Sequence, residues 1–154
     1  NKKILTCGNG GSAADSIHLS SEIVGRYEKE RKGYPSISLA SETSAITAIG
    51  NDYGFENIFS RQVEALGNPG DILVVISTSG DSQNLINASI SAKRKDIKVI
   101  GLLGRDGGRL LNLVEENITI KSQRTCRVQE MHSLLIHIIC QVLETRLKEI
   151  NFLS

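Results

Sequence analysis

Short runs of apolar residues alternate along the chain with longer segments in which apolar positions recur every three or four residues. The short runs are typical of buried strands, and the longer segments are typical of helices that bury one face. The pattern predicts strands over residues 3–7, 36–39, 71–77, 99–103 and 118–120. It predicts helices over residues 12–25, 43–49, 55–66, 82–94 and 128–150, with residues 50–54 separating the second helix from the third.

Three of these helices show a stripe of side chains on one side. In the first helix the stripe contains Ala13, Ile17, Ser21 and Val24. In the helix over 82–94 it contains Leu85, Ala88 and Ala92, with Ile86 and Ile90 beside them. The last helix repeats Met131, Leu134, Leu135, Ile138, Ile139 and Val142. This last helix is apolar enough to pack in a core built from several helices.

The order of the elements predicts the fold class. Strands that alternate with helices through short loops form a parallel sheet with helices on both faces. We therefore expect one domain over residues 1–154, a three-layer α/β/α sandwich with a central parallel sheet of about five strands, of the flavodoxin-like kind. Ligands of such sheets bind at the carboxyl ends of strands, so the loops of interest follow Cys7, Leu39, Ser77 and Leu103.

Composition narrows the classes of function. The chain has 154 residues, enough for one core, and its 18 Lys+Arg against 17 Asp+Glu leave a net charge of +1, without the basic surplus of a nucleic-acid-binding protein. No apolar run approaches the length of a membrane-spanning helix. The three cysteines form no CxxC pair, and Cys7 and Cys140 lie in apolar surroundings, so we expect buried free thiols and a reduced, cytoplasmic setting, with Cys126 left over.

The loop after the first strand has the composition of an anion site. It reads Gly8-Asn9-Gly10-Gly11-Ser12-Ala13 and opens a helix, whose free N–H groups favour an anion, while Asn9 and Ser12 add side-chain hydrogen bonds. The spacing Gly8-x-Gly10-x-x-Ala13 also matches the dinucleotide fingerprint, but no acidic residue stands at the end of the second strand to bind a ribose. A tight turn without a ligand is the simpler alternative.

A second loop of the same kind follows the third predicted strand. Residues Ser77-Thr78-Ser79-Gly80-Asp81-Ser82 carry four hydroxyl groups at the start of a helix. Hydroxyl and backbone N–H donors there suit a phosphate without Lys or Arg. The alternative is an ordinary Ser/Thr helix cap, for which one hydroxyl would suffice. The loop is not a P-loop, because no Gly-Lys-Ser/Thr follows.

Histidine and glutamate side chains supply candidate chemistry. His18 and Glu22 are spaced i, i+4 and share one helix face, where they could bind a metal, act as an acid/base couple, or form only a surface pair. His137 lies in an apolar run, where a lone histidine is more often a core residue than a ligand.

Together the motifs resemble the sugar isomerase (SIS) family, and within it the phosphoheptose isomerases. The resemblance spans nearly the whole chain and is carried by GNGGSAAD (8–15), HLSSEIVGRY (18–27), AIGNDYGFENIFSRQVEALG (48–67), ISTSGDS (76–82) and RVQEMHSLLIH (127–137). Members of the family carry a helical segment before the first strand. This chain begins at the strand and without Met, so we expect it to lack that segment.

The resemblance implies roles for particular residues. The matching positions that bind one zinc ion are His18, Glu22, Gln129 and His137, and those implicated in proton transfer are Glu22 and His137. Arg26 matches an arginine that could steady substrate or the Glu22 carboxylate, or could be a solvated cation at the helix end. The positions that contact the sugar phosphate are Asn9, Gly10, Gly11, Asn51, Asp52, Ser77, Thr78, Ser79, Ser82 and Gln129.

The zinc set raises a geometric question. Gln129 and His137 are eight residues apart, about 12 Å along a straight helix. Either Gln129 lies at or before the helix start, or the two residues serve different copies of the site in an oligomer. His132, three residues after Gln129, is an alternative ligand that the family pattern does not favour. Cys126 and the pair Gln123-Arg124 depart from the pattern, which leaves a related heptose phosphate open as the substrate.

The resemblance implies a cytoplasmic, homotetrameric aldose–ketose isomerase with sites between subunits. It would convert sedoheptulose 7-phosphate to D-glycero-D-manno-heptose 7-phosphate through an ene-diol(ate), for the heptose of lipopolysaccharide or capsule, without membrane or nucleic-acid partners. Three alternatives stay open: a regulatory SIS protein that binds a partner such as a replication initiator, a sugar-phosphate sensor without turnover, and a dinucleotide-binding domain.

Overall fold

The computed structural model describes the backbone of residues 2–152 and the side chains of residues 2–147. Five strands form one sheet in the order β2-β1-β3-β4-β5, and every neighbouring pair is parallel. The predicted five-stranded parallel sheet is therefore confirmed. The strands are β1 (Ile4–Gly8), β2 (Ser36–Ser38), β3 (Ile72–Ser77), β4 (Lys98–Gly104) and β5 (Glu116–Ile120).

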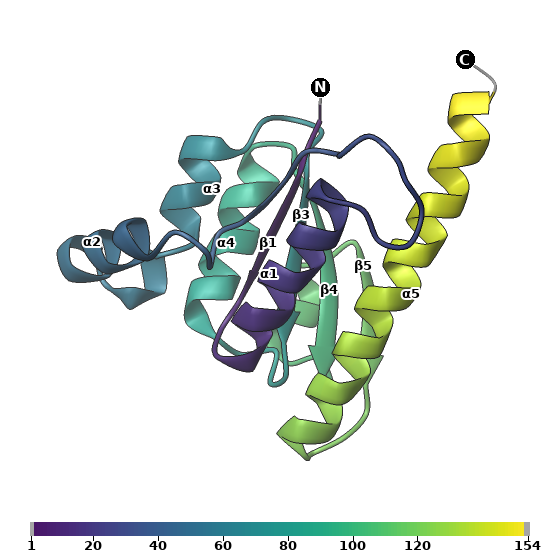
Figure 1. Cartoon of the computed structure of the whole chain (residues 1–154). Helices are drawn as coiled ribbons and strands as arrows, with labels where there is room; N and C mark the ends of the chain where they lie inside the picture. Colours follow the sequence, from purple (N-terminus) through teal and green to yellow (C-terminus); the bar gives the residue numbers. More distant parts are fainter. Residues whose placement is uncertain (1, 153–154) are drawn as a thin grey trace.

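Helices cover both faces of this sheet, as Figure 1 shows. The helices α1 and α5 pack on one face, and α3 and α4 on the other, which confirms the three-layer sandwich. None of the described helices has the length and apolar character needed to cross a membrane. The bounds are α1 (Gly11–Val24), α2 (Thr43–Tyr53), α3 (Ser60–Leu66), α4 (Gln83–Arg94) and α5 (Thr125–Phe152), with 3₁₀ turns η1 (Phe55–Asn57) and η2 (Arg109–Asn112).

Strand β3 shows why the sequence reads as a continuous apolar run. Leu73 and Val75 point into the core beneath α3 and α4, whereas Val74 and Ile76 point into the core beneath α1 and α5. Side chains alternate between the faces of a strand, and both faces are buried here, so every position from Ile72 to Ile76 is apolar. Cys7 and Cys140 are buried free thiols, one in each core, as predicted.

Several predicted boundaries are wrong. The last helix begins at Thr125 and not at residue 128. Residues 50–53, taken as a separator because of their turn-forming types, complete the last turn of α2, and the chain breaks only at Gly54, where φ is +88°. A single Gly inside a helix costs about 1 kcal/mol, which Gly50 alone does not turn into a break. The segment over 55–66 also divides into η1 and α3 rather than forming one helix.

The stripe expected to mark one face of α1 lies on its outer side. Ile17 is 41% exposed and Val24 is 50% exposed, and the buried face instead carries Leu19 and Ile23 together with several small polar residues. Ser16 shows how serine is accommodated there: its hydroxyl bonds Ala13 O and Ser38 Oγ, and its carbonyl accepts the Thr6 hydroxyl at 2.8 Å. Because these polar groups are satisfied locally, α1 packs closely on the sheet with few large side chains beneath it.

A buried carboxylate joins the amino ends of β1 and β3. One oxygen of Asp71 accepts the Lys3 N–H at 3.0 Å, and the other accepts the Asn68 N–H at 2.8 Å and the Lys3 ammonium at 2.6 Å. Burial pushes the pKa of Asp71 upward, but these hydrogen bonds and the Lys3 charge outweigh it and hold the pKa below its ordinary value. Asp71 is therefore ionised and fixes the start of β3 against β1.

Replacing Asp71 by Asn should lower the free energy of unfolding at pH 7 by about 2 kcal/mol, because the buried network loses its negative charge and one of its two acceptor oxygens. A carboxyl group with a depressed folded pKa stabilises the fold above its unfolded pKa, and this contribution fades as the pH falls through the folded pKa. Urea unfolding should therefore show the difference between wild type and D71N shrinking below about pH 3.8. The exposed Asp96→Asn is the control, and an equal loss in that variant would contradict the assignment.

Candidate functional site

The two hydroxyl- and glycine-rich loops meet at the carboxyl edge of the sheet. Strands β1 and β3 are neighbours, so the loops that follow them lie side by side. Between them lies a cavity of about 40 Å³ lined by Asn9, Ser12, Ile76, Ser77, Thr78, Ser79, Ser82 and Leu85. The structure thus brings together the hydroxyl groups of the two predicted anion-binding loops.

Two helix N-termini open onto this cavity without side-chain caps. Gly10 precedes α1 and Ser82 precedes α4, and neither makes a capping side-chain hydrogen bond. The first turns of both helices also carry no acidic residue. Some first-turn N–H groups already donate to backbone carbonyls, such as Ser12 to Asn9 O at 3.0 Å. The positive dipole ends of both helices face the cavity and favour an anion there. Because the Ser82 hydroxyl does not cap α4, the reading of this loop as an ordinary Ser/Thr cap is wrong.

A reciprocal pair of amides holds the two loops together. Asn9 Nδ2 donates to Asn84 Oδ1, and Asn84 Nδ2 donates to Asn9 Oδ1, both at 2.9 Å. Asn84 lies in the first turn of α4 and is 2% exposed. Asn84 could not be identified from the sequence, because a lone Asn in a helix carries no local signal of a partner 75 residues away.

The loop after β4 supports the Ser77–Ser82 loop from behind. Gly80 has φ +74°, and a Cβ on it would lie 2.0 Å from the Gly107 carbonyl oxygen. The Gly80 carbonyl accepts the Leu110 N–H at 2.9 Å, and Arg109 donates to the Asp81 carbonyl at 2.8 Å. The conformation of the hydroxyl-rich loop therefore depends on close backbone contact between two glycine-containing loops.

A second cluster lies further along α1, where three predicted residues come together. His18 Nε2 is 3.3 Å from Glu22 Oε1, and the His18 and His137 rings are 5.1 Å apart at 82°. The Tyr27 ring lies 5.8 Å from the His137 ring at 32°. All three predicted residues are partly exposed, and His137 belongs to this cluster rather than to the core. The arrangement can exchange a proton between imidazole and carboxylate groups.

The donor types of this cluster suit zinc, but their positions do not form a completed site. Imidazole nitrogen and carboxylate oxygen are ligands that zinc prefers. Among the residues whose side chains are described, however, no group of three or more His, Cys, Asp or Glu is placed to hold a metal ion.

Gln129 lies with the first loop rather than with the histidines. It stands inside α5, which begins at Thr125, so of the two alternatives the one that puts Gln129 at or before the helix start is excluded. A Cβ on Gly11 would lie 2.3 Å from Gln129 Nε2, which shows that the amide covers the start of α1. His132 is fully buried and contacts Leu103 O through Nε2 at 3.2 Å. Burial also lowers the pKa of His132, and nothing places this residue near His18.

Three further predicted residues lie outside both clusters. The Arg26 guanidinium donates to Glu28 O at 3.2 Å and pairs with Glu30 at 3.7 Å, instead of reaching the Glu22 carboxylate. Asn51 and Asp52 stand on the exposed end of α2, where Asn51 Nδ2 donates to Asp52 Oδ1 at 2.7 Å. Asp52 lines a separate hollow of about 480 Å³ beside α3, and neither residue lines the cavity between the two loops.

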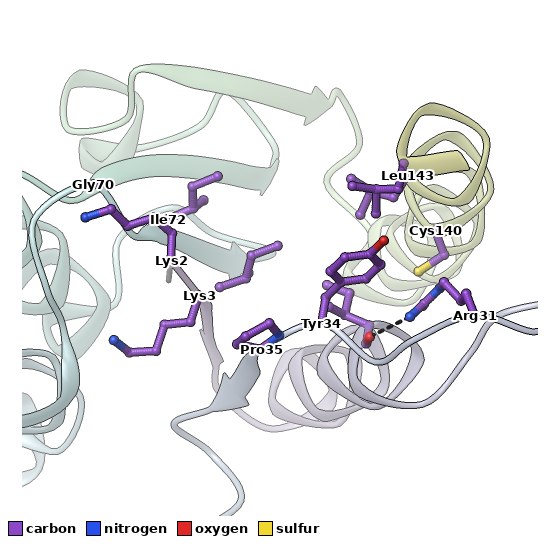
Figure 2. Close-up of a pocket in the computed structure, with 12 residues that line it drawn as sticks. Lys2, Lys3, Arg31, Tyr34, Pro35, Gly70, Ile72, Cys140 and Leu143 are labelled. Atoms are coloured by element: carbon purple, nitrogen blue, oxygen red, sulfur yellow. Dashed lines mark hydrogen bonds between the residues drawn. The ribbon is translucent and has the colours of Figure 1, made fainter. Parts of the chain in front are cut away.

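A more apolar pocket lies at the other end of the sheet (Figure 2). It has a volume of about 210 Å³ and is lined mainly by the starts of β1 and β3, the Tyr34–Pro35 segment and α5. Its cations already have partners, because Lys3 pairs with Asp71 and Arg31 pairs with Glu144. Ligands of parallel sheets bind at the carboxyl edge, so the paired loops are the stronger candidate site.

The fold and the paired loops are those of a SIS-domain protein, and a family model described as the SIS domain matches residues 1–104. Comparison with curated relatives identifies the family within the SIS-domain proteins. A phosphoheptose isomerase of Geotalea daltonii is 57% identical over 146 residues, 95% of this chain and 76% of the relative. One of Nitratiruptor sp. is 54% identical over 143 residues, 93% of this chain and 76% of the relative. The chain belongs to the phosphoheptose isomerase family.

Solved structures agree with this assignment. The phosphoheptose isomerase of Neisseria gonorrhoeae matches with a TM-score of 0.88 at 47% identity, and that of Francisella tularensis with a TM-score of 0.90 at 41% identity. Each alignment covers 94% of this chain and 77% of the solved chain.

Replacing Gly80 by Ala should weaken binding of inorganic phosphate by at least about tenfold, because the added Cβ meets the Gly107 backbone and displaces the hydroxyl groups. Isothermal titration calorimetry measures this directly. Gly70→Ala is the matched control: its φ is +81°, but its Cβ would meet only the flexible Lys2 side chain. G70A should lose about 1 kcal/mol of stability and keep its phosphate affinity. Unchanged affinity in G80A would exclude the loop as the anion site.

Proposed function

We propose that the protein is an aldose–ketose isomerase that converts sedoheptulose 7-phosphate to D-glycero-D-manno-heptose 7-phosphate. The observation that carries this proposal is the pairing, along one helix, of an anion site at the start of α1 with the cluster of His18, Glu22 and His137 beyond it. The high identity to phosphoheptose isomerases supports the same reaction.

The phosphate would lie between the two loops, held by hydroxyl groups and helix N-termini. Binding energy from the phosphate then positions the carbonyl end of the sugar. Residues 11 and 18 are about 10 Å apart along α1, so the acid/base cluster stands at a distance from the anion site. We place Ser77, Thr78, Ser79 and Ser82 at the phosphate, with Asn9, Gly10, Gly11, Ser12 and Gln129 around the near part of the sugar.

Glu22 would remove a proton from C1 of the ketose, and the electron pair would form an ene-diolate with the carbonyl carbon C2. The proton returns to C2, while His137 moves a proton between the two oxygens, so the aldehyde forms at C1 without gain or loss of electrons. The reaction needs no nicotinamide or flavin, because the oxidation of C1 balances the reduction of C2. Arg26, Asn51 and Asp52 would take part in substrate contacts only after rearrangement or from another copy of the chain.

We include zinc in this proposal because the imidazole and carboxylate groups of the cluster are ligands that zinc prefers. His18, Glu22 and His137 would hold it, and Gln129, which lies by Gly11 in this chain, would serve the site of another copy. Bound zinc would supply a Lewis acid for the developing negative charge on oxygen.

A binding protein or sensor without turnover is the alternative function. A module that only binds a sugar phosphate or a protein partner requires the two loops but not the imidazole–carboxylate cluster. The proximity of His18, Glu22 and His137 therefore favours the enzyme.

Turnover tests the reaction. Wild type should convert sedoheptulose 7-phosphate to the aldose in ¹³C NMR spectra, and Glu22→Gln and His137→Ala should each lower kcat by roughly 10²- to 10⁴-fold. Both variants should still bind the sugar phosphate. Glu116→Gln, on the exposed edge strand, is the matched control. Metal analysis of the same wild-type and His137→Ala samples tests whether zinc is bound and whether His137 is needed to hold it. Binding without conversion by wild type would identify a sensor instead.

We also propose a cytoplasmic homotetramer whose product serves lipopolysaccharide or capsule synthesis. The free buried thiols fit a reducing compartment. An apolar stripe on α5 supports assembly: Met131, Leu134, Ile138 and Val142 are 40–53% exposed. Exposed apolar stripes of this kind mark interaction surfaces, and Ile17 and Val24 of α1 add two further exposed apolar residues.

A charge placed in the α5 stripe should break the assembly. Wild type should show four times the 16.8 kDa chain mass by light scattering, and Leu134→Glu should shift the protein to smaller species. Phe55→Glu is the control, because Phe55 is 61% exposed on the opposite side of the sheet. A tetramer in L134E, or a monomer in wild type, would contradict this surface assignment.

A further inference from the structure

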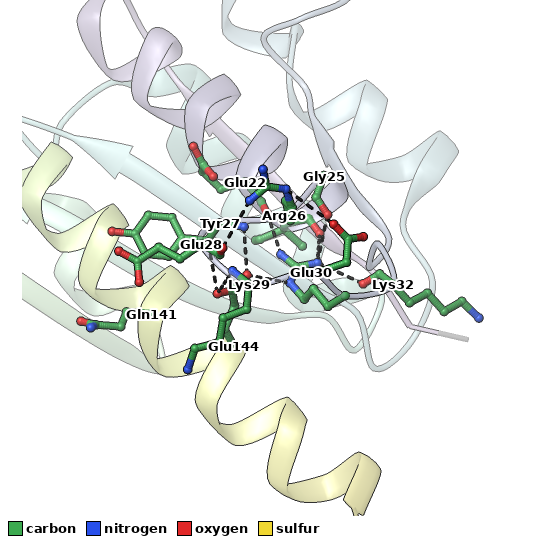
Figure 3. Close-up of polar contacts among 12 residues, drawn as sticks. Glu22, Gly25, Arg26, Tyr27, Glu28, Lys29, Glu30, Lys32, Gln141 and Glu144 are labelled. Atoms are coloured by element: carbon green, nitrogen blue, oxygen red, sulfur yellow. Dashed lines mark hydrogen bonds and ion pairs between the residues drawn. The ribbon is translucent and has the colours of Figure 1, made fainter.

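A buried carboxylate on α5 binds the loop that follows α1. The Glu144 side chain is only 4% exposed, although it is charged. It accepts three consecutive backbone N–H groups, from Tyr27 at 2.9 Å, Glu28 at 3.2 Å and Lys29 at 3.0 Å, and the Nε–H of Arg31 at 3.2 Å (Figure 3). Burying a carboxylate is costly unless each oxygen is bonded, and here both oxygens are.

The electrostatics agree with this geometry. Burial pushes the pKa of Glu144 upward, but the backbone N–H groups and Arg31 outweigh it and hold the pKa below its ordinary value. Glu144 is therefore an anion bound in a nest of backbone amides.

Arg31 extends this contact to the end of α1. Its Nη2 donates to Glu22 O at 2.6 Å, and its Nη1 donates to Ile23 O at 3.0 Å and Gly25 O at 3.2 Å. The last carbonyls of a helix have no partner within the helix, so the guanidinium completes the helix end. The residue whose carbonyl it binds most closely is Glu22, the proposed base.

Tyr27 connects the same carboxylate to His137. The Tyr27 N–H binds Glu144, and the Tyr27 ring lies against the His137 ring, with His18 on another side of the imidazole. Glu144 follows His137 by two helical turns and therefore lies on the same side of α5. One face of α5 thus carries both the imidazole and the carboxylate that fixes the ring packed against it.

We propose that Glu144 is a positioning residue for the acid/base pair Glu22 and His137. Through Arg31 it fixes the main chain at Glu22, and through the Tyr27 N–H it fixes the ring beside His137. This inference rests on the proposed function, because it assigns Glu144 to the reaction of that site. Displacing catalytic groups by about 1 Å can cost up to roughly 10²-fold in rate, so the fixed separation of α1 and α5 contributes to catalysis.

Glu144→Gln tests the proposal with kinetics and NMR together. The variant keeps the size of the side chain but replaces an acceptor oxygen by an amide donor facing N–H groups. We expect kcat to fall at least about tenfold with KM changed less than about twofold, because the phosphate loops lie elsewhere. The chain has three histidines, so selective ¹³Cε1 labelling gives three signals. The His137 signal should move toward its position in Tyr27→Leu, which lacks the ring.

Two further variants separate positioning from general destabilisation. Val63→Ala creates a cavity in the core under α3, on the other face of the sheet, and should leave kcat and the His137 signal unchanged. Arg31→Lys keeps the three backbone bonds of Glu144 but loses the fork that binds the end of α1. Like Glu144→Gln, it should lower kcat. If Glu144→Gln does not fold, Arg31→Lys serves as the test in its place.

The His137 signal makes the outcomes distinguishable. An unmoved His137 signal in Glu144→Gln, or a loss of kcat no larger than in Val63→Ala, would overturn the positioning role. If wild type does not convert sedoheptulose 7-phosphate, the proposed reaction fails, and the His137 signal alone decides whether Glu144 positions the imidazole.

Discussion

The pairing of β1 with β3 is the contact on which the candidate site depends. The two strands are parallel, with Ile4 opposite Ile72 and Gly8 opposite Ile76, although 68 residues separate them in sequence. The chain first adds β2 on one side of β1 and then crosses to place β3 on the other. At such a switch the loops leave the sheet in different directions and open a crevice between them. The hydroxyl groups and helix N-termini converge only because this pair is in register.

Helix α1 connects the two loops to the acid/base cluster and fixes the position of one relative to the other. It starts at Gly11 beside the cavity and ends where Arg31 binds its last carbonyls. A helix of 14 residues is a nearly rigid element, so His18 and Glu22 take their places from its two fixed ends. Helix α5 closes the arrangement, because it contributes Gln129 at one end of α1 and Glu144 at the other.

Local features of the sequence explain which parts could be predicted. The strands, the layer order and both loops follow from apolar periodicity and from runs of Gly, Ser and Thr, which act over short distances. The buried face of α1 could not be read in this way, because its serines are satisfied by partners on other elements such as Ser38. Asn84 and Glu144 could not be identified for the same reason: the hydrogen-bond partner of each lies at least 75 positions away in the sequence. The spacing of His18 and Glu22 was visible, whereas the separation of Gln129 from His137 depends on where α5 begins.

The amide pair between Asn9 and Asn84 has a consequence for the electric field at the cavity. An amide is both donor and acceptor, so two of them can join the loops without introducing charge. A Lys–Asp pair in the same place would put a permanent counterion beside the helix N-termini. The amide pair adds no such charge, and Asp81, the carboxylate that precedes α4, is paired with Arg109 at 3.5 Å. The positive ends of both helix dipoles can therefore act on a bound anion without a counterion supplied by the contact that joins the loops.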